Sequence, residues 1–230
     1  MDTQEILHEL EKMGTAQNRK IYARHGVVDE MFGVSYANLG ALKKKIKIDH
    51  ALALELWNSG IHDARVLATM VADPQQMKGK TLDAWVKELN DSATTDAFAK
   101  LASQTALARK KAAQWTQSKQ EYVSRAGWTI LALLATNDPT LPATFFQPYL
   151  EQIAETIHAR QNWTKEAMNN ALIAIGTRDE NLEHEALDIA ARVGKVEVDH
   201  GLTFCKTPDA AHYIARTIEK RGYAMQRVAK

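Results

Sequence analysis

The sequence predicts an all-α fold, a curved α-solenoid made of antiparallel pairs of short helices. Three observations predict it. Apolar residues recur with a helical period along almost the whole chain, prolines and glycines are few (five and eleven among 230 residues), and the links between helical segments are short. A string of roughly a dozen short helices, none long enough for a simple bundle, is typical of stacked helical pairs.

The stack matches HEAT-like units, which are about 40–47 residues long, so about five or six fit in this chain. The alternative is an irregular globular α-domain. We expect one HEAT-like domain over residues 1–230, with residues from about 195 to 230 as a capping element. The concave side of such a stack is an extended binding surface.

Residues 122–135 show the helical pattern most clearly, because their apolar side chains fall on one stripe while Arg125 lies opposite. Similar patterns predict the other helices at residues 3–12, 16–25, 36–46, 50–58, 61–71, 82–89, 96–102, 106–117, 142–159, 163–176, 182–193 and 209–221.

The residues between these segments suit helix ends. Ser35 is an expected N-cap, and so is Thr207, which is followed by Pro208 at the first helical position. Gly60, Gly176 and Gly194 stand where the glycine that ends a helix is expected.

Composition narrows the class of protein. The chain has 29 basic and 28 acidic residues, a net charge of +1, and one cysteine, Cys205. A single cysteine excludes a disulfide framework and fits a reducing compartment. The longest mostly apolar stretch, residues 128–135, is far shorter than a membrane span, and the first residues have no apolar signal segment. We therefore expect a cytoplasmic protein without a membrane anchor.

Charge is uneven along the chain. Residues 97–120 contain five basic residues and no acidic one, namely Lys100, Arg109, Lys110, Lys111 and Lys119. Neutralising phosphates dominates duplex binding, so these are the predicted DNA-binding residues. The run from Lys43 to Lys45 is a weaker candidate, because consecutive lysines point around a helix. The alternative for both clusters is a solvated helix face.

No sequence pattern indicates a cofactor or a metal. Six possible ligands lie within 16 residues (Glu197, Asp199, His200, Cys205, Asp209 and His212), but without a recognised ligand spacing. A structural role, with a turn at Asp199–Gly201 and Cys205 packed, explains them better. The chain also has no Ser/His/Asp arrangement, no glycine-rich phosphate loop and no HExxH motif. We expect no cofactor and no metal.

Several segments resemble one family when taken in order. They are Phe32-Gly-Val-Ser-Tyr-Ala-Asn-Leu-Gly-Ala-Leu-Lys, Ala53-Leu-Glu-Leu-Trp-Asn-Ser-Gly-Ile-His-Asp-Ala-Arg-Val-Leu-Ala, Trp85-Val-Lys-Glu-Leu, Val123-Ser-Arg-Ala-Gly-Trp-Thr-Ile-Leu, Lys165-Glu-Ala-Met-Asn-Asn-Ala-Leu, Gly194-Lys-Val-Glu-Val-Asp-His-Gly and Cys205-Lys-Thr-Pro-Asp-Ala. Across residues 30–215 their order and spacing resemble the AlkD-type bacterial DNA alkylation repair family.

The resemblance implies a HEAT-like solenoid that holds duplex DNA on a concave basic face. It also implies a DNA glycosylase activity that removes N3- or N7-alkylated purines. In that family an aspartate and two tryptophans stabilise the positive charge that develops on the sugar, and an arginine grips the DNA backbone. The aspartate matches Asp96 and the arginine matches Arg125.

This sequence departs from the family at both tryptophans, whose positions fall on Ser92 and Asn170. Trp115, Trp128 and Trp163 are other aromatic candidates, although core packing explains them better. Asp96 has its own alternative, a cap or a dipole partner at the start of a helix. Two functions therefore remain open: a glycosylase acting on alkylated duplex DNA, and a non-catalytic helical scaffold that binds DNA structures or a protein partner.

Overall fold

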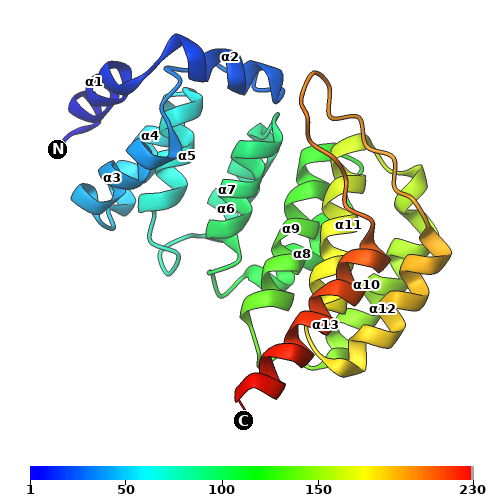
Figure 1. The fold of residues 1–230 in the computed structure, drawn as a ribbon. Helices are drawn as coiled ribbons and strands as arrows, with labels where there is room; N and C mark the ends of the chain where they lie inside the picture. The colour runs from blue at the N-terminus through cyan, green and yellow to red at the C-terminus, as the bar shows by residue number, and fades with distance from the viewer. Residues whose placement is uncertain (229–230) are drawn as a thin grey trace. The chain divides into compact units, whose positions relative to one another are not determined.

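A computed structural model describes residues 1–228, with side chains up to residue 220, and confirms the all-α prediction (Figure 1). The α-helices are α1 (Thr3–Met13), α2 (Ala16–Arg24), α3 (Tyr36–Ile46), α4 (His50–Asn58), α5 (His62–Val71), α6 (Gly79–Trp85), α7 (Ser92–Ala102), α8 (Ala108–Trp115), α9 (Glu121–Asn137), α10 (Ala143–Thr156), α11 (Asn162–Gly176), α12 (Glu180–Val193) and α13 (Ala210–Val228). Short 3-10 turns continue α6 at Val86–Glu88 and α10 at Ile157–Ala159.

The chain divides into two compact units. The N-terminal unit is Met1–Ala113 with His200–Phe204, and the C-terminal unit is Gln114–Asp199 with the chain from Cys205 onward. Each is described by itself below. The expectation of one continuous domain stays a prediction.

In the N-terminal unit α5 is the central helix, in contact with α1, α3, α4 and α7. The indole rings of Trp57 and Trp85 stack at 4.1 Å between centroids, and Phe98 of α7 packs against both. All three side chains are buried, and each such burial contributes about 1.5–3 kcal/mol. This aromatic cluster joins α4, α6 and α7.

Helix α2 is held differently, because none of its residues is buried. The Asn18 side-chain amide and the Arg19 guanidinium donate to the carbonyl oxygens of Gly33 and Phe32, each at 3.0 Å. The Tyr22 hydroxyl donates to the Val34 carbonyl at 2.5 Å. Polar contacts to residues 32–34 therefore attach α2 to its unit.

The C-terminal unit has two layers, one in which α9, α11 and α13 follow one another and one formed by α10 and α12 (Figure 1). In this unit each helix packs against the next helix but one in the sequence, a pattern that is typical of stacked repeats. Gly127 allows one close contact, since a Cβ there would lie 2.5 Å from the Thr116 backbone nitrogen.

Most predicted helix ends agree with the structure. The Ser35 side chain accepts from the Asn38 amide and caps α3. Gly60 and Gly194 have φ of 74° and 63°, the left-handed backbone expected after a helix.

Two of the five residues predicted to end or cap helices do not do so. Asp209, not Thr207, caps α13, since its carboxylate accepts from the His212 amide at 2.8 Å. Gly176 is still helical and lies where a Cβ would meet Ala186 and Ile214 at 2.7 Å, so close packing of α11 explains this glycine.

Candidate nucleic-acid interface

Asp96 lies in the second turn of α7 and lines a cavity of about 460 Å³ within the N-terminal unit. The helix begins four residues earlier, with Asp91 as its N-cap. Asp96 is therefore not a helix cap, so the cap explanation for this carboxylate is wrong, and the helix predicted to begin at residue 96 begins four residues earlier. Its side chain is half-buried.

Helices α3, α5 and α7 and the links that follow each of them surround this cavity. Its walls are largely apolar, and its polar side chains include Tyr36 and Lys43 of α3 and Asp96 and Lys100 of α7. The full lining is Tyr36, Lys43, Ile48, Thr69, Met70, Ala72, Pro74, Ala93, Asp96, Ala97, Lys100, Leu101 and Gln104. An apolar cavity with a few converging polar groups is the usual form of a small-ligand site.

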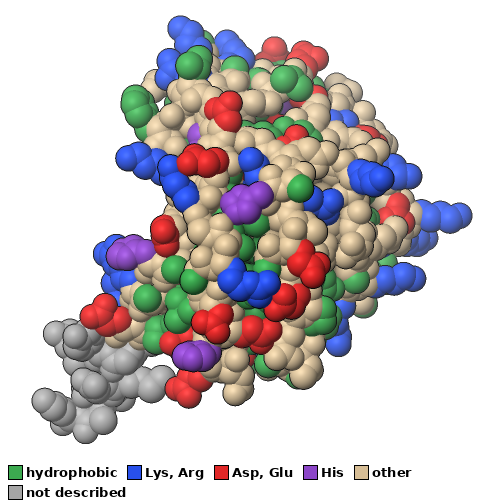
Figure 2. All heavy atoms as spheres, turned by 90° about the vertical axis from the view of Figure 1, so that its right-hand side faces the viewer, with side chains coloured by type: hydrophobic (Ala, Val, Ile, Leu, Met, Phe, Trp, Pro, Cys, Tyr) green, Lys and Arg blue, Asp and Glu red, His purple; other side chains and the backbone are tan. Residues whose placement is uncertain are grey.

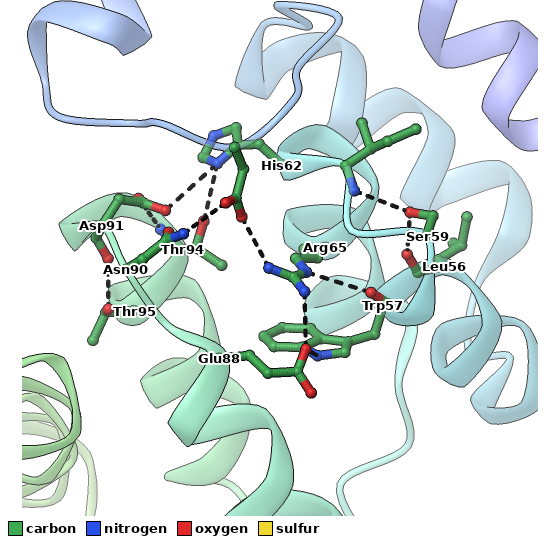
Figure 3. A network of polar contacts seen from close by, with 12 residues as sticks. Leu56, Trp57, Ser59, His62, Arg65, Glu88, Asn90, Asp91, Thr94 and Thr95 are labelled. Carbon is green, nitrogen blue, oxygen red and sulfur yellow. Dashed lines mark hydrogen bonds and ion pairs between the residues drawn. The ribbon is translucent and has the colours of Figure 1, made fainter.

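A buried polar network fixes the start of α7 (Figure 3). Asp91 accepts from the Thr94 amide at 2.8 Å, and its second oxygen lies 3.8 Å from His62 Nδ1. The Thr94 hydroxyl contacts the same His62 nitrogen at 3.0 Å. Burial works to raise the pKa of Asp91, but the His62 ring and Thr94 favour the carboxylate and hold this pKa below its ordinary value of 3.8.

Arg65 of α5 extends the same network (Figure 3). Its guanidinium donates to Asp29 at 2.9 Å and to Glu88 at 2.8 Å, and it lies 5.3 Å from the centre of the Trp57 ring. The Trp57 indole N–H also donates to Glu88, at 3.0 Å. Arg65 therefore joins α4 and α5 to the 3-10 turn that precedes α7.

Asp63 of α5 holds the segment that leads into α3. This carboxylate is fully buried and accepts from the backbone amides of Phe32, Gly33 and Val34 at 2.6, 3.1 and 2.7 Å. Hydrogen bonds to a charged acceptor are the strong ones, so Asp63 sets where α3 begins. Tyr36 and Lys43 of the cavity are carried on that helix.

Tyr36 keeps its proton at the cavity wall. The Tyr36 side chain is 48% exposed, so its burial is partial. This partial burial, the neighbouring Tyr22 and the charges of the nearby aspartates together raise the pKa of Tyr36 to about 12. The phenol is therefore a hydrogen-bond donor at neutral pH.

Arg125 is in a different environment in the C-terminal unit. Its side chain is only 5% exposed and donates to Glu166 at 2.6 Å and to the Trp163 carbonyl at 3.1 Å. The guanidinium also lies 5.7 Å from the centre of the Trp163 ring. Arg125 thus fastens α9 to the start of α11. The side of α9 opposite the apolar stripe is therefore not solvated at this point.

The predicted DNA-binding residues differ in exposure. Lys100, Arg109 and Lys110 are exposed in the N-terminal unit, and Lys119 is exposed in the C-terminal unit. Lys111 is 5% exposed, and its ammonium lies 2.6 Å from Asp83. Asp83 therefore already neutralises Lys111 inside the fold, whereas the other four reach solvent.

The other candidates from the sequence lie as follows. Trp115 and Trp128 are buried, as core packing requires, while Trp163 is half-buried beside Arg125. Ser92 is half-buried at the first position of α7, and Asn170 is exposed on α11.

Within the described part of the chain no His, Cys, Asp and Glu side chains group as a metal site would require. Cys205 is exposed, so the expectation that it is packed is wrong. In the same part, no helix is both long and apolar enough to span a membrane. On the face shown in Figure 2, cationic and anionic side chains are interspersed, in agreement with the small net charge.

Sequence reasoning missed much of the cavity lining. No pattern in the sequence marks Tyr36, Met70 or Gln104 as residues of a site. These residues come together only when α3, α5 and α7 pack, so neither a motif nor a spacing marks them.

Comparison with known proteins agrees with this architecture. The family model described as "DNA alkylation repair enzyme" matches residues 6–214. The chain therefore belongs to the DNA alkylation repair family, as its sequence segments indicated. A solved structure with 30% sequence identity superposes with a TM-score of 0.88 over 96% of this chain and 95% of the other. That protein belongs to a family described as related to the HEAT-like repeat DNA glycosylases and as having affinity for branched DNA structures.

Two uncharacterised Listeria proteins are also similar. One from Listeria innocua is 28% identical over 214 residues, and one from Listeria monocytogenes is 27% identical over the same length. Each alignment covers 90% of this chain and 93% of the relative.

Proposed function

We propose that this protein binds DNA and prefers branched DNA to linear duplex. The observation that carries the proposal is the likeness, over nearly the whole of both chains, to a structure from a family with affinity for branched DNA. Because both the fold and 30% of the residues are shared, a common ligand class is the simplest expectation.

The exposed cations support a phosphate-binding surface. Arg109 and Lys110 are adjacent on α8, and Lys100 is exposed on α7 of the same unit. Cations that neutralise phosphates make DNA binding salt-dependent. Each phosphate contact makes the affinity fall more steeply as the salt concentration rises. Lys111 is left out of this surface because Asp83 neutralises it, and Lys119 is a further contact in the C-terminal unit.

The test is fluorescence anisotropy with a three-way junction and a linear duplex of equal length at two salt concentrations. We expect tighter, salt-sensitive binding of the junction, and a loss of about tenfold or more for Arg109→Glu with Lys110→Glu. A charge reversal at exposed Lys12 is the matched control. DNA affinity that does not change with salt and is the same in the double variant would contradict the proposal. A protein partner would then be the better explanation.

A second candidate is excision of N3- or N7-alkylated purines, and the placement of Asp96 in a cavity favours it. In that reaction the Asp96 carboxylate stabilises the cationic sugar and positions water. The replacement of both tryptophan positions by Ser92 and Asn170 weighs against it. Single-turnover release of N7-methylguanine from duplex DNA, abolished by Asp96→Asn, is the expected result if excision occurs; salt-sensitive binding without release excludes it.

A further inference from the structure

Helix α2 of the N-terminal unit carries three basic residues and no acidic one, namely Arg19, Lys20 and Arg24, and all three are exposed. Lys20 and Arg24 are four residues apart, so they lie on the same side of the helix. Like charges at this spacing repel each other and destabilise a helix. The sequence therefore keeps a repulsion on α2 that a bound anion would relieve.

The hydrogen bonds of α2 show which of its sides faces the rest of its unit. Asn18 and Tyr22 share one side, and they donate to the carbonyl oxygens of Gly33 and Val34. Lys20 follows Asn18 by two residues and Arg24 follows Tyr22 by two, which is a step of about 200° around the helix. Both cations therefore lie on the side opposite the attachment and extend into solvent.

The outer side of α2 suits the phosphates of a nucleic acid. Lys20 and Arg24 are about 6 Å apart along the helix axis, and a DNA strand carries one phosphate about every 3.4 Å of duplex axis. Both long side chains can therefore contact one strand. A lipid surface fits less well, because a helix that binds lipid needs a broad apolar face, whereas α2 has only Ile21 besides the inward-facing Tyr22 as a large apolar or aromatic residue.

The N-terminal unit thus has two groups of exposed cations. One group consists of Lys100 on α7 and of Arg109 and Lys110 on α8, and the other lies on α2. Among the described helices, α2 makes no extensive contact with α7 or α8, so the two groups belong to separate parts of the surface. A linear duplex is a single rod, whereas a branched DNA offers further arms to a second group of cations.

We propose that α2 binds the phosphates of a second arm of a branched DNA. Lys20 and Arg24 contact the backbone of this arm, while the cations of α7 and α8 hold the first arm. This rests on the proposed DNA binding and names the surface that gives the preference for branched DNA. Phosphate contacts fix the position of DNA without reading its sequence, so α2 selects the shape of the DNA.

The experiment reverses the two charges of α2 and measures fluorescence anisotropy with a three-way junction and a linear duplex of equal length. For Lys20→Glu with Arg24→Glu we expect about tenfold weaker binding of the junction, and duplex binding within about twofold of the unchanged protein. The slope of log affinity against log salt for the junction should fall by about 1.8, because each lost phosphate contact removes about 0.9.

Two results would overturn the proposal. An equal loss of affinity for junction and duplex would mean that α2 contacts the same arm as α8. Unchanged affinity for the junction would mean that Lys20 and Arg24 form a solvated helix face without a ligand.

Two further variants make the test specific. Lys78→Glu with Lys80→Glu changes the net charge of the same unit equally at two exposed lysines, and it is expected to keep the junction preference. An equal loss in this control would attribute the effect to net charge and refute the proposal. Lys20→Gln with Arg24→Gln removes the charges together with their repulsion, in case the reversed charges unfold α2, as checked by circular dichroism. A folded glutamine variant that keeps the full preference would also refute the proposal.

The two proposals fail separately. If neither junction nor duplex binds in a salt-sensitive manner, the proposed function is wrong. If both bind and Arg109→Glu with Lys110→Glu weakens both, but the α2 variants do not weaken the junction selectively, only α2 has been assigned wrongly.

Discussion

Asp96 and Arg125 are the two residues that the family resemblance singles out, and their surroundings differ sharply. Asp96 is half-buried at a cavity that opens to solvent, while Arg125 is buried with its charge paired to Glu166. The residue type that a family shares at a position therefore does not decide what the side chain there can contact. A functional assignment depends on the neighbours, which here support a ligand site at Asp96 and a structural role at Arg125.

The first prediction concerns the support of the cavity. Asp63→Ala leaves three backbone amides without their acceptor, so we expect a loss of about 4 kcal/mol in the free energy of unfolding. Urea unfolding followed by circular dichroism measures it. A loss below about 1 kcal/mol would mean that water replaces the carboxylate and that Asp63 does not set the position of α3.

The second prediction tests the structural role of Arg125. Arg125→Ala removes an ion-pair partner of a largely buried Glu166 and a hydrogen bond to α11, so we expect a loss of about 3 kcal/mol in unfolding free energy. Arg125→Ala with Glu166→Ala is the control and is expected to lose less, because the carboxylate is removed together with the guanidinium. A fully stable Arg125→Ala variant that no longer binds DNA would instead make Arg125 a DNA contact.

The third prediction is a pH dependence at the cap of α7. Because the folded pKa of Asp91 lies below 3.8, its ionised form stabilises the fold at pH values above the unfolded pKa, and this contribution is lost as pH falls through the folded pKa. Asp91→Asn is expected to cost about 1 kcal/mol at pH 7 and less as the pH falls below about 4. Thermal unfolding from pH 3 to 7 measures this, and a pH-independent difference would contradict it.

The smallest stability effect is expected at Asp96. Asp96→Asn keeps the shape of the side chain, which is half-buried in a cavity wall, so unfolding free energy should change by less than about 1 kcal/mol. Urea unfolding followed by circular dichroism measures this change. A large loss of stability with unchanged DNA binding would reverse the comparison and make Asp96 the structural residue of the two.

Much of the fold could be predicted from the sequence, because helical periodicity and caps are local signals. The predicted spans for α3 and α4 agree with the structure residue for residue, and Ser35 caps α3 as expected. Asp209 displaced Thr207 as a cap because a carboxylate nearer the helix reaches the amide at the third position.

The site was harder to predict, because it depends on contacts between distant segments. Burial of Lys111 against Asp83 joins residues 28 positions apart, and the contact of Arg125 with Glu166 joins residues 41 apart. One helical wheel shows which side of a helix is polar. It does not show that a neighbouring helix covers that polar side.

Helix α2 forms where its sequence predicts a helix, yet it is only weakly attached to its unit. With no buried residue, it is held by three side-chain hydrogen bonds to the backbone of residues 32–34. Elements with little buried apolar area open at low free energy without global unfolding. The amides of α2 will therefore exchange with deuterium earlier than those of α9, and a protease will cut here first while the rest of the N-terminal unit stays folded.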